Sequence, residues 1–218
     1  DTLALTPSQL TKYYFIQQRY YRNIEWKPGY AKIEQERQDI AHKWQYYCNK
    51  LMETDHPSSE LHQYASMIYH MSNSEWHKAE EINEMLIAHC SQDSHSYAEY
   101  AYYRASIYES WGKTNNALLW YIRSAIADVK SATKDTASIR ILSEKLLPQD
   151  INRAFHYINI ALENVLFYNA QLRHEDITAI LPLIEKEYML SQEAQQAETQ
   201  KFLSIISILA VALAIICM

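Results

Sequence analysis

The residues of this chain that could do chemistry are its nine histidines and the acidic residues at positions 80, 81 and 84. His70 and His77 lie two helical turns apart and the sequence contains no HExxH motif, so the ligand spacing of a zinc site is missing. The acidic residues follow the spacing of a solvated helix face, whereas acid–base catalysis requires burial of the carboxylate. We therefore expect no metal site, no cofactor and no catalytic residue.

Motifs for nucleophiles and phosphates are also missing from the sequence. The two glycines, Gly29 and Gly112, cannot build a GxSxG elbow or a phosphate-binding loop. Three cysteines at wide spacing form no metal knuckle, and Cys48 with Cys90 is the one candidate disulfide pair; buried free thiols are the alternative. An enzyme stays open only as a third class of function, because lytic enzymes can also be built on stacked helices.

Eighteen tyrosines, several of them in doublets such as Tyr102-Tyr103, are the unusual feature of the composition. Neighbouring residues on a helix point about 100° apart, so one ring of a doublet can enter the core while the other faces a groove or solvent. Tyrosine also provides a large contact area at low entropic cost. The doublets therefore indicate either aromatic packing between helices or an adhesive protein-binding surface.

The elements that position these residues are expected to be helices. With two glycines and five prolines among 218 residues, the chain lacks the turn residues of a β-sandwich, a barrel or an α/β enzyme, which predicts an all-α fold. The net charge is −6 and the sequence has no cluster of Lys and Arg. We therefore expect no nucleic acid as a partner of this region.

Residues 98–130 match the helix-turn-helix pattern of a tetratricopeptide repeat (TPR). In such a repeat, small residues let the paired helices approach, aromatic residues fill the space between them, and a glycine closes the first helix. The residues expected to pack in this way are Ala105, Tyr108, Gly112, Ala117 and Tyr121.

The same motif recurs on both sides of this unit. It lies 38 residues earlier around Ala79, with Ser74 at the turn, and 37 residues later around Ala154 and Ala161, with Gln149 at the turn. Three units at a nearly constant period predict a right-handed solenoid of antiparallel helix pairs, with about nine helices in all.

A weaker fourth unit is centred on Ala41. Its two helices are expected at Thr6–Tyr21 and Tyr30–Glu53, on either side of a turn at Pro28-Gly29, which is the strongest turn signal in the chain.

The first helix of each unit is expected to line the inner groove of the solenoid. That placement predicts a partner-binding groove made of Tyr64, Ile68, Met71, Tyr102, Ser106, Glu109, Ile139 and Ser143. These side chains are apolar, hydroxyl or acidic, whereas repeats that clamp a peptide carboxylate use Lys, Arg and Asn. We therefore expect a hydrophobic helix or peptide, or the chain's own N-terminal repeats, in the groove; a homodimer is a further candidate.

The C-terminal part of the chain changes in character twice. Residues 1–190 are expected to form the repeat domain, closed by a capping helix at His174–Leu190 in which Pro182 makes a kink or opens the second turn. Residues 191–201 are polar and helix-favouring, which predicts a semi-rigid linker. Residues 202–218 carry no charge and would span about 26 Å, so we predict a membrane helix that continues beyond them; a buried core helix is the alternative.

Four stretches of the chain resemble a family of membrane-anchored regulators from Bacteroidetes-type bacteria. They are SAIADVKSATK (124–134), DINRAFHYIN (150–159), YNAQLR (168–173) and ILPLI (180–184). The resemblance covers about residues 10–218 and implies a periplasmic TPR-like region, one transmembrane helix in the inner membrane, a cytoplasmic coiled coil and a LuxR-type helix-turn-helix. It places residues 1–201 in the periplasm and leaves the coiled coil and helix-turn-helix outside this sequence. One departure is Leu147-Pro148-Gln149, where a glycine turn is expected, so this turn should differ from the others.

The resemblance and the composition of the groove predict a function together. We expect the extracytoplasmic sensor or protein-interaction region of a membrane-anchored transcriptional regulator, which signals through its membrane helix to a DNA-binding output absent from this chain. The competing class is a tail-anchored structural adaptor that holds a complex at the membrane and has no output domain.

Overall fold

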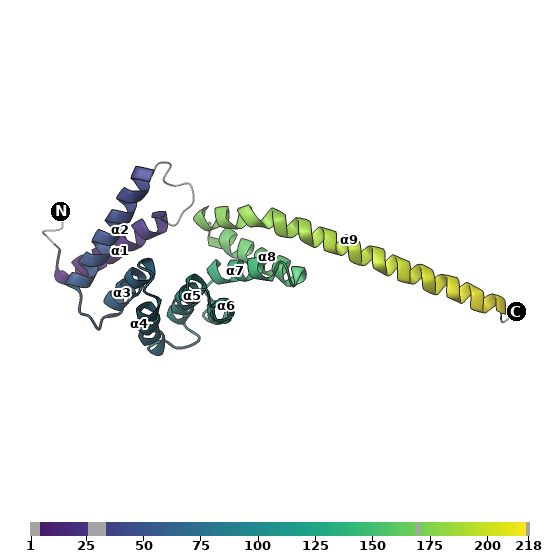
Figure 1. Ribbon diagram of the computed structural model, residues 1–218, viewed down its shortest axis with the longest axis horizontal. Helices are drawn as coiled ribbons and strands as arrows, with labels where there is room; N and C mark the ends of the chain where they lie inside the picture. The colour runs from purple at the N-terminus through teal and green to yellow at the C-terminus, as the bar shows by residue number, and fades with distance from the viewer. Residues whose placement is uncertain (1–4, 26–33, 169–170, 217–218) are drawn as a thin grey trace. The chain divides into compact units, whose positions relative to one another are not determined.

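The computed structural model describes residues 5–25, 34–168 and 171–216, and every regular element among them is an α-helix (Figure 1). The helices are α1 (Pro7–Glu25), α2 (Glu34–Thr54), α3 (Glu60–Ser72), α4 (Trp76–Ala88), α5 (His95–Ser110), α6 (Thr114–Lys130), α7 (Ala137–Leu146), α8 (Ile151–Tyr168) and α9 (Gln171–Ile216). The prediction of an all-α fold with about nine helices is confirmed for these residues.

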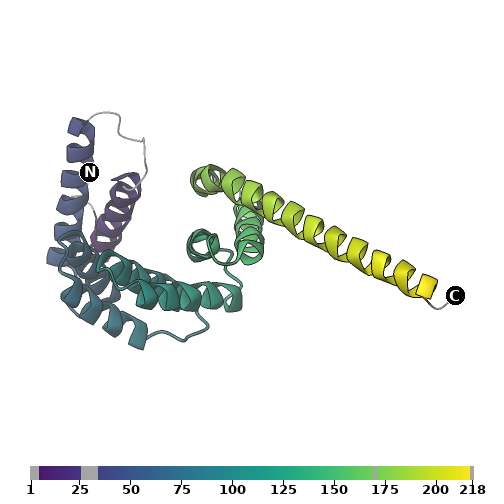
Figure 2. The ribbon, with the colours of Figure 1, turned by 45° about the vertical axis from the view of Figure 1, so that its right-hand side comes forward.

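The chain divides into two compact units, Asp1–Ser131 and Ala132–Met218. In the first unit, consecutive helices pack as the pairs α1 with α2, α3 with α4, and α5 with α6 (Figure 2). In the second unit, α8 packs against both α7 and α9. Repeat spacing predicts no boundary near residue 131, and the boundaries expected after residues 190 and 201 fall inside helix α9 (Gln171–Ile216).

The core of the first unit is built from one face each of α2 to α5. On α2, Trp44, Cys48 and Leu51 recur at the spacing of one helix face and are at most 2% exposed. They pack with apolar side chains of α3, α4 and α5, among them Ala79, which is fully buried. Ala41, the expected centre of a fourth repeat unit, is only half-buried. The expected Pro28-Gly29 turn lies outside the described residues.

The turns α3–α4 and α5–α6 share one backbone conformation. Gly112 (φ 80°) and Ser74 (φ 58°) both take the left-handed conformation, 38 residues apart. The amide of each donates to the carbonyl three residues before it, at 3.0 and 3.1 Å, and the next amide donates to the carbonyl five residues before, at 2.8 and 2.9 Å. These bonds satisfy the last carbonyls of the preceding helix, as a Schellman-type C-cap does.

The α7–α8 turn is built differently. The amide of Asp150 donates to the carbonyl of Leu146 at 2.8 Å, and residues 147–150, all of them described, include no left-handed conformation. The expectation that Leu147-Pro148-Gln149 forms a different turn is therefore confirmed. Leu147 keeps a right-handed helical backbone (φ −47°, ψ −46°), and the ring of Pro148 fixes its φ near about −65°, so this turn is made without a left-handed residue.

Helix α9 joins three parts that the sequence analysis treats separately. Its first turns pack on α8 through Ile177 and Ile184, and Tyr188 stacks on Phe155 with ring centroids 4.1 Å apart. The helix then runs without interruption to Ile216. Pro182 lies inside it, eleven residues after its first residue, so the alternative in which this proline opens the second turn is wrong.

The C-terminal end of α9 is the most apolar part of the described chain. Residues 174–216 form the one described helix that is long and apolar enough to cross a membrane, with a mean hydropathy of 2.0 over its most apolar window. None of that window is buried within the chain, so the structure does not support the alternative of a buried core helix. The fold is thus a TPR-like array of helices followed by one exposed apolar helix.

Candidate protein-binding face

The α3 residues expected to line a groove are core residues. Tyr64, Ile68 and Met71 are 5%, 1% and 8% exposed and belong to the main core cluster of the first unit. The spacing of three and four residues that assigns them to one helix face is correct, but that face is covered by other helices. These three side chains do not form the open surface that the sequence predicts.

The α5 residues of the same prediction are more accessible. Tyr102 and Ser106 are half-buried and Glu109 is exposed. The ring of Tyr102 meets those of Tyr103 and Tyr121 edge to face, and the hydroxyl of Tyr121 donates to the Glu109 carboxylate at 2.6 Å.

The last two predicted groove residues belong to the second unit. Ile139 packs half-buried beside the α8–α9 core, and Ser143 is fully buried with its hydroxyl bonded to the carbonyl of Arg140. The predicted groove residues of α3 and α5 therefore lie in the first unit, whereas Ile139 and Ser143 belong to the second.

A tyrosine face connects α3, α5 and α6 within the first unit; we define it by Tyr64, Tyr102, Tyr103 and Tyr121. The hydroxyls of Tyr64 and Tyr103 share a hydrogen bond of 2.7 Å, and their rings meet edge to face with centroids 5.6 Å apart. Such edge-to-face pairs stabilise the packing beyond the area they bury. These contacts fix the positions of the two rings relative to each other.

Helix α1 packs on this tyrosine face. Phe15 meets the ring of Tyr64 edge to face, with centroids 5.6 Å apart. The guanidinium of Arg19 lies 5.8 Å from the centroid of Tyr64 and forms a 3.2 Å ion pair with Glu99 of α5. At Tyr64, the face is thus covered by α1 from the chain's own N-terminal segment. Phe15, Arg19 and Glu99 had no role in the sequence analysis, because repeat spacing does not reveal which other helix covers a face.

The tyrosine hydroxyls are held in their neutral form. Burial raises the pKa of Tyr64 to about 12 and raises that of Tyr103 well above its ordinary value. Burial, together with the hydrogen bond to Glu109, also raises the pKa of Tyr121. Neutral phenols donate and accept hydrogen bonds but do not act as bases near pH 7. The phenols of this face therefore serve as hydrogen-bonding groups.

A buried polar network joins the α3–α4 pair to the α5–α6 pair. Arg104, 6% exposed, donates to the side-chain carbonyl of Asn83 at 2.6 Å, and Asn83 donates to the backbone carbonyl of Tyr100 at 2.9 Å. The guanidinium also lies 3.7 Å from Glu80 and 5.1 Å from the ring of Trp120. Glu80 is half-buried and paired, whereas Glu81 and Glu84 are exposed, so the expectation of a solvated acidic face is wrong for Glu80 and correct for the other two.

The sequence itself contains a signal for this network. Asn83 lies four residues after the packing alanine Ala79. The equivalent inward position is Tyr121 after Ala117 and Ile158 after Ala154 in the next two repeats. A polar residue at a position that is aromatic or aliphatic in the other units indicates a buried hydrogen bond.

The alanines and tyrosines predicted to pack between repeat helices are buried, whereas Gly112, predicted with them, is exposed. The exposed fractions are 0% for Ala79, Ala105, Ala117, Ala154 and Ala161, 2% for Tyr121 and 8% for Tyr108. Gly112 lies in the turn, where its left-handed backbone gives it a conformational role.

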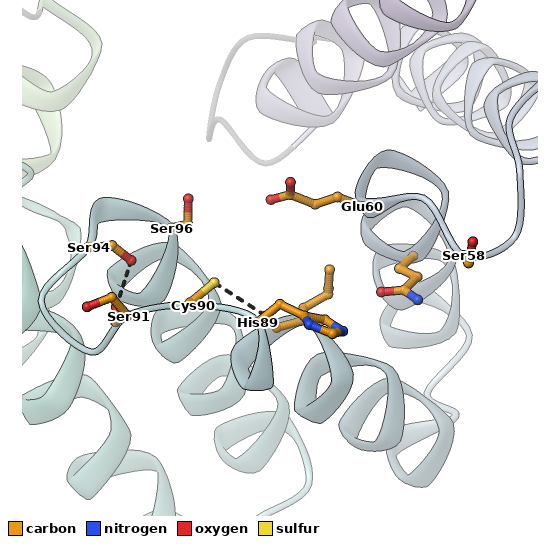
Figure 3. A pocket seen from close by; sticks show the side chains of 9 residues that line it. Ser58, Glu60, His89, Cys90, Ser91, Ser94 and Ser96 are labelled. Atoms are coloured by element: carbon orange, nitrogen blue, oxygen red, sulfur yellow. Dashed lines mark hydrogen bonds between the residues drawn. The ribbon is translucent and has the colours of Figure 1, made fainter.

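A hollow of about 380 Å³ lies between α3, α4 and the start of α5 (Figure 3). Most of the residues that line it have polar side chains: Ser58, Glu60, Gln63, Leu86, His89, Cys90, Ser91, Ser94 and Ser96. Glu60 accepts a hydrogen bond from Tyr100 at 2.5 Å, and the thiol of Cys90 donates to the carbonyl of Leu86 at 3.3 Å. Burial raises the pKa of Cys90, so this thiol is a poor nucleophile.

The cysteines and metal ligands can be assessed only in the described residues. Cys48 and Cys90 are free thiols, so the alternative of a disulfide between them is wrong, and Cys217 lies outside the described residues. The described part of the chain brings together no group of three His, Cys, Asp or Glu side chains that could hold a metal ion.

Comparison with known proteins gives one family. The family model described as the SusR N-terminal TPR domain matches residues 1–179. No curated protein and no solved structure matches the chain. The matched span includes α1 to α8 and the first turns of α9, and it ends before the apolar part of that helix. Helical repeat folds of this type present extended surfaces for protein interaction and are not typical enzyme folds.

Proposed function

The chain belongs to the family of SusR N-terminal TPR domains, and from that premise we propose that it is the extracytoplasmic interaction region of a membrane-anchored transcriptional regulator. A protein helix or peptide binds at the tyrosine face, and helix α9 carries the resulting change toward a DNA-binding output. The observation that carries the proposal is the position of α1 on the tyrosine face, because a helix is already bound there through specific aromatic and ionic contacts.

The contacts of α1 describe the chemistry of the partner. Phe15 and Arg19 are four residues apart, so they lie on one side of their helix and reach Tyr64 and Glu99 together. A partner helix with an aromatic residue followed four residues later by arginine would reproduce both contacts. This is a helix-in-groove mode of recognition, in which spaced anchors provide the specificity.

Helix α1 also carries a feature that favours its displacement. Gln18 is fully buried, and neither polar atom of its side chain has a hydrogen-bond partner. A buried polar group without a partner costs about 1–3 kcal/mol. A partner helix with an apolar residue in place of Gln18 avoids this cost and competes with α1 for binding to the tyrosine face.

Signalling requires that the partner favour one arrangement over another. A ligand shifts an equilibrium between two states only by the difference of its affinities for them. Here the two states are α1 on the tyrosine face and α1 displaced. The exposed apolar end of α9 supports attachment of the chain to a membrane. The inner membrane as its location, with residues 1–201 in the periplasm, is the part of the proposal that rests on the resemblance to membrane-anchored regulators.

The experiment replaces Tyr102, which is half-buried on the tyrosine face, in the full-length regulator that carries this chain. Tyr46→Ala is the matched control, because Tyr46 is a tyrosine of α2 that is 54% exposed. Partners are captured from native membranes and quantified by mass spectrometry, and transcripts are measured in the same cells. We expect Tyr102→Ala to lose a partner and the regulated transcripts while Tyr46→Ala keeps both.

The other outcomes are distinct. Equal capture by both variants would remove the tyrosine face from the proposal. Loss of the partner by Tyr102→Ala with transcripts unchanged would favour the tail-anchored structural adaptor.

A further inference from the structure

Helix α6 exposes a stripe of large apolar side chains that the tyrosine face does not use. Leu119, Ile122, Ile126 and Val129 are 48%, 39%, 50% and 74% exposed. Their spacing of three, four and three residues places them along one line of the helix, as in the seam of a coiled coil. We call these four residues the α6 stripe. Tyr121 of the same helix is only 2% exposed, so the stripe lies on a different side from the tyrosine face.

The repeat register shows that packing within the solenoid does not require this stripe. The positions 38 residues earlier, on α4, hold Glu81 and Glu84 in place of Leu119 and Ile122. The positions 37 residues later, on α8, hold His156, Asn159 and Glu163 in place of Leu119, Ile122 and Ile126. The equivalent helices therefore pack in their pairs with polar residues at these positions. The apolar Leu119, Ile122 and Ile126 of α6 need another explanation.

The charges beside the stripe indicate what covers it. The exposed charged residues of α6 are Arg123 and Lys130, whereas its one carboxylate, Asp128, is 7% exposed. Arg123 lies 4.5 Å from the ring centroid of Trp120, and Lys130 pairs with the exposed Asp93 at 2.8 Å. A basic border complements an acidic one, and a second copy of α6 would place like charges beside each other.

The size of the stripe also favours a single helix as its partner. A stable complex between two proteins buries about 800 Å² on each side, and four partly exposed side chains supply only a fraction of that area. One amphipathic helix lying along α6 needs no more than such a stripe, because its anchors recur every three or four residues.

We propose that the α6 stripe is the docking site of an acidic amphipathic helix from a protein partner. Its apolar residues meet Leu119, Ile122, Ile126 and Val129, and its carboxylates face Arg123 and Lys130. This surface is separate from the tyrosine face, so the chain offers two binding surfaces in its first unit.

The test measures binding of two designed helices to the full 218-residue chain in nanodiscs. Both are 21-residue peptides with leucine at the seam positions; one has glutamate and the other lysine at the flanking positions. We expect the glutamate helix to bind at least tenfold more tightly than the lysine helix, as measured by fluorescence anisotropy. We expect the double substitution Ile122→Gln and Ile126→Gln to weaken that binding at least tenfold.

The matched control replaces Glu81 and Glu84, the equivalent positions on α4, by glutamine, and we expect binding to stay within twofold of the unmodified chain. Circular dichroism checks that each variant keeps its helix content. Equal binding of the two designed helices, or binding that the α6 double substitution leaves unchanged, would overturn the proposal. A dimer in sedimentation that the α6 substitution dissociates would assign the stripe to a second copy and also overturn it.

Discussion

Ser74 and Gly112 hold equivalent positions in the turns of two consecutive repeats, but a left-handed backbone destabilises the fold by different amounts at the two residues. For an L-residue this conformation costs about 1–2 kcal/mol, while glycine adopts it freely. We expect Ser74→Gly to raise the free energy of unfolding by about 0.5–1 kcal/mol, because the strain relieved exceeds the entropy that glycine loses on folding. Urea denaturation measures the change.

Gly112→Ala is the reciprocal substitution. An added Cβ would meet no heavy atom within 4 Å, so backbone strain is its only cost, and we expect a loss of about 1 kcal/mol. If both substitutions left stability unchanged, the left-handed assignment of these turns would be wrong.

The buried tyrosines predict a dependence of stability on alkaline pH. Tyr64 has a pKa of about 12 in the folded chain and about 10 when unfolded, so folding favours its neutral form. That contribution is fully present below pH 10 and is lost as the pH rises from 10 to 12. We expect Tyr64→Phe to flatten the fall in unfolding free energy over this range, as measured by urea titration at pH 9, 10 and 11. The control is Tyr46→Phe at an exposed tyrosine, which should leave the slope as it is.

The sequence predicts packing residues better than it predicts the binding face. Repeat spacing identifies Ala79, Ala117 and Ala154 because close helix contact demands small residues at fixed intervals. The same spacing places Tyr64 on an inward face but carries no information about α1, which reaches that face from 49 positions earlier in the chain at Phe15. Coverage by a distant helix is a tertiary property, and periodicity reports only local ones.

At the scale of helices, the joint between α4 and α5 rests on buried polar groups. We expect Asn83→Ala to lower the free energy of unfolding by about 3 kcal/mol, because it leaves the buried guanidinium of Arg104 without its 2.6 Å acceptor. Urea denaturation again provides the measurement. The double variant Asn83→Leu with Arg104→Met removes both partners and should be more stable than Asn83→Ala. If the double variant unfolded at a lower urea concentration than Asn83→Ala, the hydrogen bonds of the network would stabilise the fold by more than the cost of burying its polar groups.

The helices themselves were predictable wherever turn chemistry was explicit. The pair α5 and α6 follows the expected unit at residues 98–130, since Gly112 marks its turn. The second helix of the expected fourth unit was misjudged in its detail, because Trp44, Cys48 and Leu51 are its deepest residues and Ala41 is not. Bulky aromatic and thiol side chains fill space that the repeat pattern assigns to a small residue.

At the scale of the whole chain, the apolar end of α9 carries the proposed membrane location. We expect the 218-residue chain to stay with the membrane fraction after carbonate extraction, because an exposed helix of this length and hydropathy is a candidate membrane span. A chain that ends at Lys201 lacks the segment and should appear in the soluble fraction. Release of the 218-residue chain by carbonate would indicate peripheral attachment and would contradict a membrane-spanning helix.

Because α9 is one continuous helix, the number of residues in the linker at 191–201 sets how the apolar end is rotated about the helix axis relative to the first turns. Each alanine inserted between residues 193 and 201 turns everything beyond it by about 100° and advances it by about 1.5 Å. If the regulator signals by rotation, its transcriptional output should oscillate across a series of one to seven insertions, with a period near 3.6 residues. A steady rise or fall would indicate axial movement instead. Basal output would then be adjustable through the angular setting of this one helix, with both binding surfaces left untouched.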